Sequence, residues 1–220
     1  MSQPTVSIRV WDAPTRLFHW AIVILLGTSW LTQRLYWMEL HFLSGYSMLA
    51  LLLFRLGWGF CGSATARFVH FLKSPLDALR HLARLHRSEQ DTEIGHNAAG
   101  GWMVLIMLTM LALQVATGLC ANDDIATQGP LADYVGKAWS DWMTHIHAVN
   151  FQCIEVAIAL HLIAIAAYAA LKRQNLVGPM ITGRKRLPAT VTPPKLASPL
   201  LAVALFGVAA AAVALLVNTL

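Results

Sequence analysis

The stretch IHAVNFQCIEVAIALHLIAIAAYAAL, residues Ile146–Leu171, indicates the class of fold. It exceeds the roughly 20 mostly apolar residues that a helix needs to cross a bilayer. It does not alternate apolar and polar residues with a period of two, as a membrane β-strand would. The stretch therefore predicts a transmembrane helix, and this helix carries two histidines, His147 and His161.

Four further segments have the same character: 17–36, 41–60, 96–119 and 199–217. The chain has 220 residues, of which 57% are hydrophobic and 12% charged, and only three are cysteines. This composition excludes a disordered chain and a disulfide scaffold. We expect an all-α integral membrane protein in which a four-helix transmembrane bundle spans residues 8–186. A proline-rich linker, 187–198, then leads to a fifth C-terminal transmembrane helix.

Basic residues gather on one side of these spans: Arg9, Arg16, Arg67, Lys73, Arg80, Arg84, Arg87, Lys172, Arg173, Arg184, Lys185, Arg186 and Lys195. The other side has Arg34 and Lys137, together with an acidic loop that contains Asp123, Asp124, Asp133 and Asp141. By the positive-inside rule the acidic side faces out, which places the N-terminus in the cytoplasm and the C-terminus outside. The first span lacks a small-residue cleavage site and is expected to be retained. Topology explains the net charge of +5, with lipid head groups as a secondary attraction, so it does not indicate nucleic-acid binding.

Four of the nine histidines lie within or at the ends of spans: His19, His41, His147 and His161. On a helix, His147 and His161 lie within about 40° of one face and roughly 21 Å apart. His145 points about 160° away from His161, so it is the weaker candidate. Ionisable groups inside a membrane are functional candidates by default.

Depth in the membrane pairs these histidines. His41 and His147 lie near the outer surface, whereas His19 and His161 lie toward the cytoplasm. Two facing imidazoles suit the two axial positions of haem iron, and the absence of a Cys-x-x-Cys-His motif indicates b-type haem. A zinc site would need three or four ligands at one depth. We therefore predict two haem b groups, with a hydrogen-bonding role in helix packing as the alternative for any one histidine.

Other residues fit this prediction and have simpler explanations too. Gly45 would let a porphyrin approach the helix of His41, or would serve close helix packing. Arg55, 14 residues beyond His41, would hold a propionate of the inner haem, or would snorkel to the cytoplasmic surface. Gln114 would lie near the outer haem, or would make a polar contact between helices.

Three remaining features have no assigned role. Glu155 lies mid-span, off the histidine face, with no partner that the sequence names. The cysteines, Cys61, Cys120 and Cys153, have no ligand spacing. The basic segment Arg67–Arg87 has the leucine spacing of an amphipathic helix on the membrane surface.

Several motifs together resemble a known family: VWDAPTRLFHW (Val10–Trp20), ELHFLSGY (Glu39–Tyr46), FRLGWG (Phe54–Gly59), GHNAAGGWMV (Gly95–Val104) and DDIATQGPLA (Asp123–Ala132). Over about residues 8–186 the chain is similar to the bacterial cytochrome b561 and nickel-iron hydrogenase cytochrome b subunit family. That family also resembles the membrane subunit of formate dehydrogenase. The resemblance implies the bacterial cytoplasmic membrane and two b haems with the same axial pairs.

The resemblance also implies a quinone site at His96 and Asn97, near the cytoplasmic-side haem. An imidazole and an amide can hydrogen-bond a quinone carbonyl and relay a proton. The alternative is that both residues merely cap the third helix. His96 is also the main rival of His19 as the partner of His161.

We therefore expect a dihaem cytochrome that passes electrons across the membrane, as the quinone-reactive subunit of an oxidoreductase. Its partners would be the quinone pool and an outer-side c-type cytochrome or hydrogenase-like protein, docked at the acidic loop. One alternative is a self-contained enzyme that oxidises superoxide and reduces quinone, with Lys137 and Arg34 attracting the anion. The other is a haem-free membrane anchor for a peripheral subunit.

Overall fold

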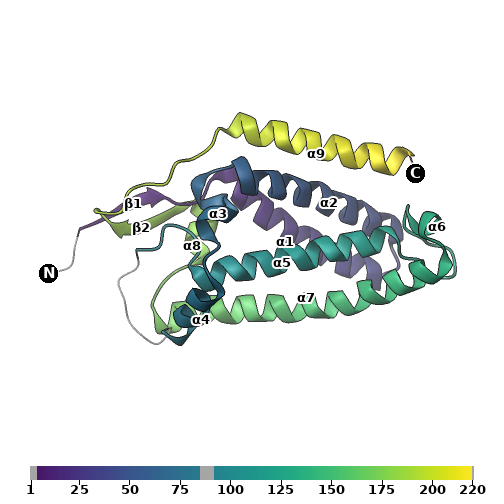
Figure 1. The fold of residues 1–220 in the computed structure, drawn as a ribbon, viewed down its shortest axis with the longest axis horizontal. Coiled ribbons are helices and arrows are strands. Elements are labelled where there is room, and N and C mark those ends of the chain that lie inside the picture. The colour runs from purple at the N-terminus through teal and green to yellow at the C-terminus, as the bar shows by residue number, and fades with distance from the viewer. Residues whose placement is uncertain (1–3, 85–91, 220) are drawn as a thin grey trace. The chain divides into compact units, whose positions relative to one another are not determined.

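The computed structural model describes residues 4–84 and 92–219, and most of them are helical (Figure 1). The long helices are α1 (Ala13–Arg34), α2 (Met38–Cys61), α5 (Ala98–Leu119), α7 (Lys137–Leu171) and α9 (Pro199–Thr219). The short ones are η1 (Ala64–Ala66), α3 (Phe68–Phe71), α4 (Pro75–Ala83), α6 (Ala132–Val135) and α8 (Val177–Thr182).

In the described part of the chain, α2, α5, α7 and α9 are long and apolar enough to cross a membrane. The prediction of an all-α membrane fold is therefore confirmed. Helix α1 has 22 residues and is long enough to cross a membrane, but it is less apolar and does not belong to this group. Its crossing of the membrane stays a prediction.

The chain divides into two compact units. The first unit comprises Met1–Leu17, Leu56–Ile106 and Ile158–Ala202. The second unit comprises Phe18–Arg55, Met107–Ala157 and Val203–Leu220.

The first unit contains a two-stranded antiparallel sheet that the sequence did not predict. Strand β1 (Thr5–Arg9) pairs with β2 (Arg184–Pro188), in a register that sets Thr5 opposite Pro188. Leu187 is fully buried in a small apolar core with residues of and beside β1, namely Ile8, Val10 and Trp11. The strand therefore continues past residue 186, into the segment that the sequence indicated as a linker.

Gly183 connects α8 to this sheet. Its φ of +78° lies in the left-handed region, which favours glycine. Its carbonyl oxygen accepts hydrogen bonds from the backbone N–H groups of Val10 and Trp11, at 2.9 and 3.2 Å. A Cβ at this position would lie 2.8 Å from the carbonyl oxygen of Trp11, so a side chain would disturb the junction.

A buried aspartate holds the start of α1 in the same unit. One carboxylate oxygen of Asp12 accepts the backbone N–H of Thr15 at 2.7 Å, as an N-cap does. The other oxygen accepts the indole N–H of Trp58 at 3.1 Å. Asp12 is 5% exposed and Trp58 is fully buried, so this contact ties α1 to the end of α2 away from water.

The basic segment of the first unit forms two short helices, α3 and α4, rather than one long helix. Ser74 caps α4 by accepting the backbone N–H of Asp77, and Pro75 occupies the first turn. Three leucines spaced as on one helix face are exposed on α4: Leu76, Leu79 and Leu82. The predicted helix with a leucine face is thus confirmed over α4 alone, and its place on the membrane surface stays a prediction. Arg87 lies outside the described residues.

In the second unit, α7 begins at Lys137 rather than at the predicted Ile146. Gly136, with a φ of +77°, separates it from α6. Residues 137–145 mix aromatic and polar side chains, so hydropathy alone did not reveal the added turns. Asp141, which was expected in the acidic loop, therefore lies on a helix.

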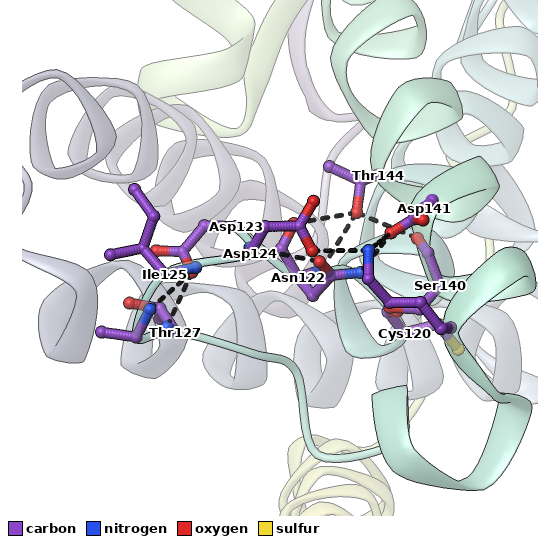
Figure 2. A network of polar contacts seen from close by, with 11 residues as sticks. Cys120, Asn122, Asp123, Asp124, Ile125, Thr127, Ser140, Asp141 and Thr144 are labelled. Atoms are coloured by element: carbon purple, nitrogen blue, oxygen red, sulfur yellow. Dashed lines mark hydrogen bonds and ion pairs between the residues drawn. The ribbon is translucent and has the colours of Figure 1, made fainter.

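Asn122 fastens the α5–α7 connection to the start of α7 (Figure 2). Its backbone N–H donates to Thr144 Oγ1 at 2.9 Å, and its carboxamide donates to Ser140 Oγ and Asp141 Oδ1. Ser140 Oγ in turn donates to the carbonyl oxygen of Cys120 at 2.7 Å. These bonds cross-link the end of α5 to the turn of α7 that precedes His147.

Candidate functional site

Two of the predicted histidines face each other in the second unit. The rings of His41, on α2, and His147, on α7, have centroids 6.3 Å apart and planes inclined at 76°. This is the pair that depth along the spans predicted for the outer site. Both side chains are partly buried.

The Nδ1 atom of each ring is bonded to a backbone carbonyl oxygen. His41 Nδ1 lies 3.0 Å from the oxygen of Ser29 on α1, and His147 Nδ1 lies 2.8 Å from that of Gln114 on α5. A carbonyl oxygen can only accept a hydrogen bond, so each Nδ1 carries a proton, and in the neutral ring Nε2 is then the nitrogen with the lone pair. Histidines that ligate metals have this arrangement, because the second bond fixes the tautomer and the ring orientation.

A further layer of buried polar groups holds these carbonyl groups in place. The carboxamide of Asn150 donates to Gln114 Oε1 at 2.7 Å and to the carbonyl oxygen of Met110 at 2.9 Å. The hydroxyl groups of Ser29 and Ser44 are 2.5 Å apart. Gln114 therefore makes the predicted polar contact between helices, and its backbone carbonyl oxygen also positions His147. Its place near the outer haem stays a prediction.

Two glycines border the pair. A Cβ on Gly118 would lie 2.9 Å from His147 Cε1, so only a residue without a side chain lets the imidazole approach α5 this closely. A Cβ on Gly45 would meet no atom within 4 Å. Gly45 therefore borders open space, and close helix packing does not explain it.

The donor set suits haem iron. Iron bonded to two opposed imidazole nitrogens at about 2 Å each would separate the ring centroids by roughly 6 Å. The separation of 6.3 Å between His41 and His147 agrees with this value. Two nitrogens suffice for an iron that a porphyrin already holds through four others. Among residues 4–84 and 92–219, no group of three or more His, Cys, Asp or Glu side chains is arranged for a metal ion.

The second predicted pair is divided between the units. His19 belongs to the second unit, where its ring lies edge-on to Trp20 with centroids 5.0 Å apart. His161 belongs to the first unit. Their pairing stays a prediction.

Arg55, on α2 in the second unit, is 3% exposed. Its side chain is therefore buried within the protein rather than extended to a surface. This burial contradicts the alternative that Arg55 snorkels.

His96 and Asn97 lie together in the first unit, at the start of α5. The His96 ring packs against Trp11 and Phe71, with centroid distances of 4.7 and 5.0 Å. Asn97 Oδ1 accepts the backbone N–H of Gly100 at 2.8 Å, so the predicted capping alternative is confirmed for Asn97. Its carboxamide also donates to Tyr168 Oη at 2.7 Å, a contact that capping does not require.

Sequence reasoning missed Tyr168 and the role of His81. Tyr168, on α7, is 7% exposed, and its hydroxyl oxygen lies 2.5 Å from Nε2 of His81 on α4. The spacing contained a signal, because Tyr168 follows His161 by seven residues, which brings it back to nearly the same helix face. Glu155, by contrast, is exposed on α7.

Facing, carbonyl-anchored histidines in a helical membrane protein are a ligand arrangement that suits a b-type cytochrome. The family model that describes prokaryotic cytochrome b561 matches residues 10–183, which is more than half of the chain. The chain therefore belongs to the prokaryotic cytochrome b561 family, whose members bind haem b and serve membrane electron transfer. Comparisons with curated proteins and with solved structures give no match.

Proposed function

We propose that this cytochrome carries electrons across the membrane between a redox partner on the outer side and the quinone pool. It would do so through two b haems, one on His41 and His147 and the other on His19 and His161. A haem supplies reversible one-electron chemistry at its iron.

The observation that carries the proposal is the His41–His147 pair. Both Nδ1 atoms are anchored on carbonyl oxygens, which directs the basic nitrogen of each ring toward a ligand. The four helices α1, α2, α5 and α7 each contribute a group to this site in the second unit: Ser29, His41, Gln114 and His147. Hydrogen bonds to both rings fix the orientation of the ligands, which suits a haem that changes oxidation state in place.

The contacts of Asn97 and His96 support the quinone end of the proposal. Asn97 has two carboxamide N–H bonds, one of which is directed to Tyr168. The other would bind a quinone carbonyl oxygen. His96, packed between two aromatic rings, would bind beside it.

An outer-side partner, a c-type cytochrome or a hydrogenase-like protein, would dock on the acidic loop and α6. Of its carboxylates, Asp124 and Asp141 form ion pairs with Lys137. Asp133 accepts a hydrogen bond from Gln128 at the exposed surface. Its carboxylate would form an ion pair with a basic side chain of the partner. Asp133→Asn should slow oxidation or reduction by the partner at low salt, and an unchanged rate would oppose this docking site.

The superoxide alternative gains no support from these contacts. Lys137 would have to attract the anion, but its ammonium group lies between two carboxylates, one of them 2.5 Å away. The local field at Lys137 therefore does not favour an approaching anion.

The test is a reduced-minus-oxidised spectrum with pyridine-haemochrome quantification on the detergent-purified protein. His147→Ala and His161→Ala should each remove a different one of two b haems. His145→Ala is the matched control, because His145 is an exposed residue on the same helix. A protein without haem, or with haem insensitive to both substitutions, would leave the membrane-anchor alternative in its place.

A further inference from the structure

Three polar side chains form a continuous hydrogen-bonded chain in the first unit. Tyr168 Oη lies 2.5 Å from His81 Nε2, and it accepts the carboxamide N–H of Asn97 at 2.7 Å. His81 comes from α4, Tyr168 from α7, and Asn97 directly precedes α5. His81 is partly exposed, whereas Tyr168 is buried, so the chain leads from an accessible imidazole to a buried phenol.

The hydrogen-bonded side chains have two protonation states. With neutral His81 protonated on Nδ1, Tyr168 donates its O–H to Nε2. With doubly protonated His81, Nε2–H donates to Tyr168 Oη, and the phenol O–H must turn to a different acceptor. Taking up a proton at His81 thus frees a phenol proton at the buried end.

The buried end contacts the predicted quinone ligand Asn97 and lies on the same helix as the predicted haem ligand His161. Asn97 is a proposed quinone ligand, and Tyr168 lies seven residues beyond His161 on α7. Seven residues amount to about 10.5 Å along the helix and return to within about 20° of the same face. The phenol of Tyr168 therefore contacts the predicted quinone ligand and lies on nearly the same face of α7 as the predicted haem ligand.

We propose that His81 and Tyr168 relay protons to and from a quinone bound at Asn97, an inference that rests on the proposed quinone function. Reduction of the quinone requires two protons and two electrons, and a reduced haem would supply the electrons one at a time. For each proton, the Tyr168 O–H bond breaks as a quinone O–H bond forms, and His81 Nε2–H gives its proton to Tyr168 Oη. His81 then regains a proton from water, and quinol oxidation reverses each transfer.

Neighbouring charges favour this relay. The ammonium group of Lys172, at the end of α7, lies 5.8 Å from the centroid of the Tyr168 ring. A cation over the ring stabilises the negative charge that develops on the phenol as its proton leaves. On α4, Arg80 and Asp77 form an exposed ion pair with each other. His96, which can also titrate, directly precedes Asn97.

The test compares His81→Gln and Tyr168→Phe with the wild-type haem-loaded protein. The haem is reduced chemically and then mixed with decylubiquinone, over the range in which histidine titrates, about pH 5 to 8. A parallel set uses ferricyanide, which accepts electrons without protons. Matched controls are His70→Gln, an exposed histidine bonded to the Ala64 carbonyl group, and Tyr134→Phe, an exposed tyrosine.

Both relay variants should slow oxidation by quinone about tenfold or more, as expected for loss of a positioned acid. His81→Gln should also flatten the pH dependence. Oxidation by ferricyanide should be unchanged, and both controls should match the wild type. Titration of decylubiquinone by calorimetry should give wild-type affinity for Tyr168→Phe but weaker affinity for Asn97→Ala.

The outcomes separate the two proposals. Wild-type quinone rates at every pH in His81→Gln and Tyr168→Phe would overturn the relay and leave the quinone function intact. A loss of quinone affinity as large as the loss of rate would also overturn the relay, because Tyr168 would then be a binding residue. Oxidation of the wild-type haem by ferricyanide but not by quinone would refute the quinone function, and the relay with it.

Discussion

His147 donates its Nδ1–H to the backbone carbonyl oxygen of Gln114, at 2.8 Å. The bond joins an imidazole on α7 to the main chain of α5, so the ring orientation depends on how closely the two helices pack. Gly118, one turn further along α5, permits that approach, because a Cβ there would lie 2.9 Å from His147 Cε1. The site is therefore sensitive to residues that never touch a ligand.

Gly118→Ala should weaken haem binding at the His41–His147 site. The new methyl group would lie 2.9 Å from His147 Cε1 and would push the imidazole away from its carbonyl acceptor. Loss of such an orienting contact typically lowers metal affinity about 10- to 100-fold. Haem content per chain after purification measures the effect, and Gly27→Ala, where a Cβ meets nothing within 4 Å, should retain the wild-type value.

Arg55→Gln should lower the midpoint potential of one haem. A buried guanidinium near a haem favours the more negative, reduced state, so its removal favours the oxidised state. A tenfold change in the one-electron equilibrium corresponds to about 59 mV, and we expect a shift of this order. Redox titration followed in the visible spectrum measures it, with exposed Arg34→Gln as the control. Equal potentials in Arg55→Gln and wild type would contradict a propionate contact.

Asp12→Ala should destabilise the first unit by about 2 kcal/mol or more, through loss of an N-cap and of a hydrogen bond to a charged acceptor. The buried indole N–H of Trp58 would lose its carboxylate acceptor. Thermal unfolding in detergent, followed by tryptophan fluorescence, measures the change. Asp12→Asn should lose less, since its amide oxygen can still accept one of the two bonds.

The connection after α5 should loosen at low pH. Backbone N–H groups of Thr127, Ile125 and Ala126 donate to Asp123 and lower its pKa from 3.8 to about 2. A folded-state pKa below the unfolded value means that this stabilisation is complete above about pH 4 and is lost as the pH falls through about 2. In limited pepsin digestion across this range, the connection should be cut faster as the pH falls.

Asp123→Asn should make the same connection cleavable at every pH in that range, because a carboxamide oxygen accepts these bonds more weakly. Asp133→Asn should keep the wild-type profile, since Asp133 accepts from a side chain rather than from the turn. A wild-type digestion profile in Asp123→Asn would show that the carboxylate does not hold the turn.

Sequence alone predicted the apolar helices and the His41–His147 pair, because hydropathy and helical period are local properties. It missed the β1–β2 pair, since the two strands are separated by most of the chain and each is only five residues long. It also missed the contact of His81 with Tyr168. The basic residues and leucines of α4 are typical of a surface helix, and they do not indicate that α4 contacts α7. Contacts between distant segments depend on how the helices pack, and local patterns of hydropathy and spacing do not reveal that packing.

The pairing of β1 with β2 also constrains how many times the chain crosses the bilayer. Hydrogen-bonded strands must lie on the same side of a membrane, so the chain between Arg9 and Arg184 must cross an even number of times. Helices α2, α5 and α7 would make three crossings, an odd number. We infer that the less apolar α1 supplies the fourth. A crossing by α9 would then leave the two ends of the described chain on opposite faces of the membrane.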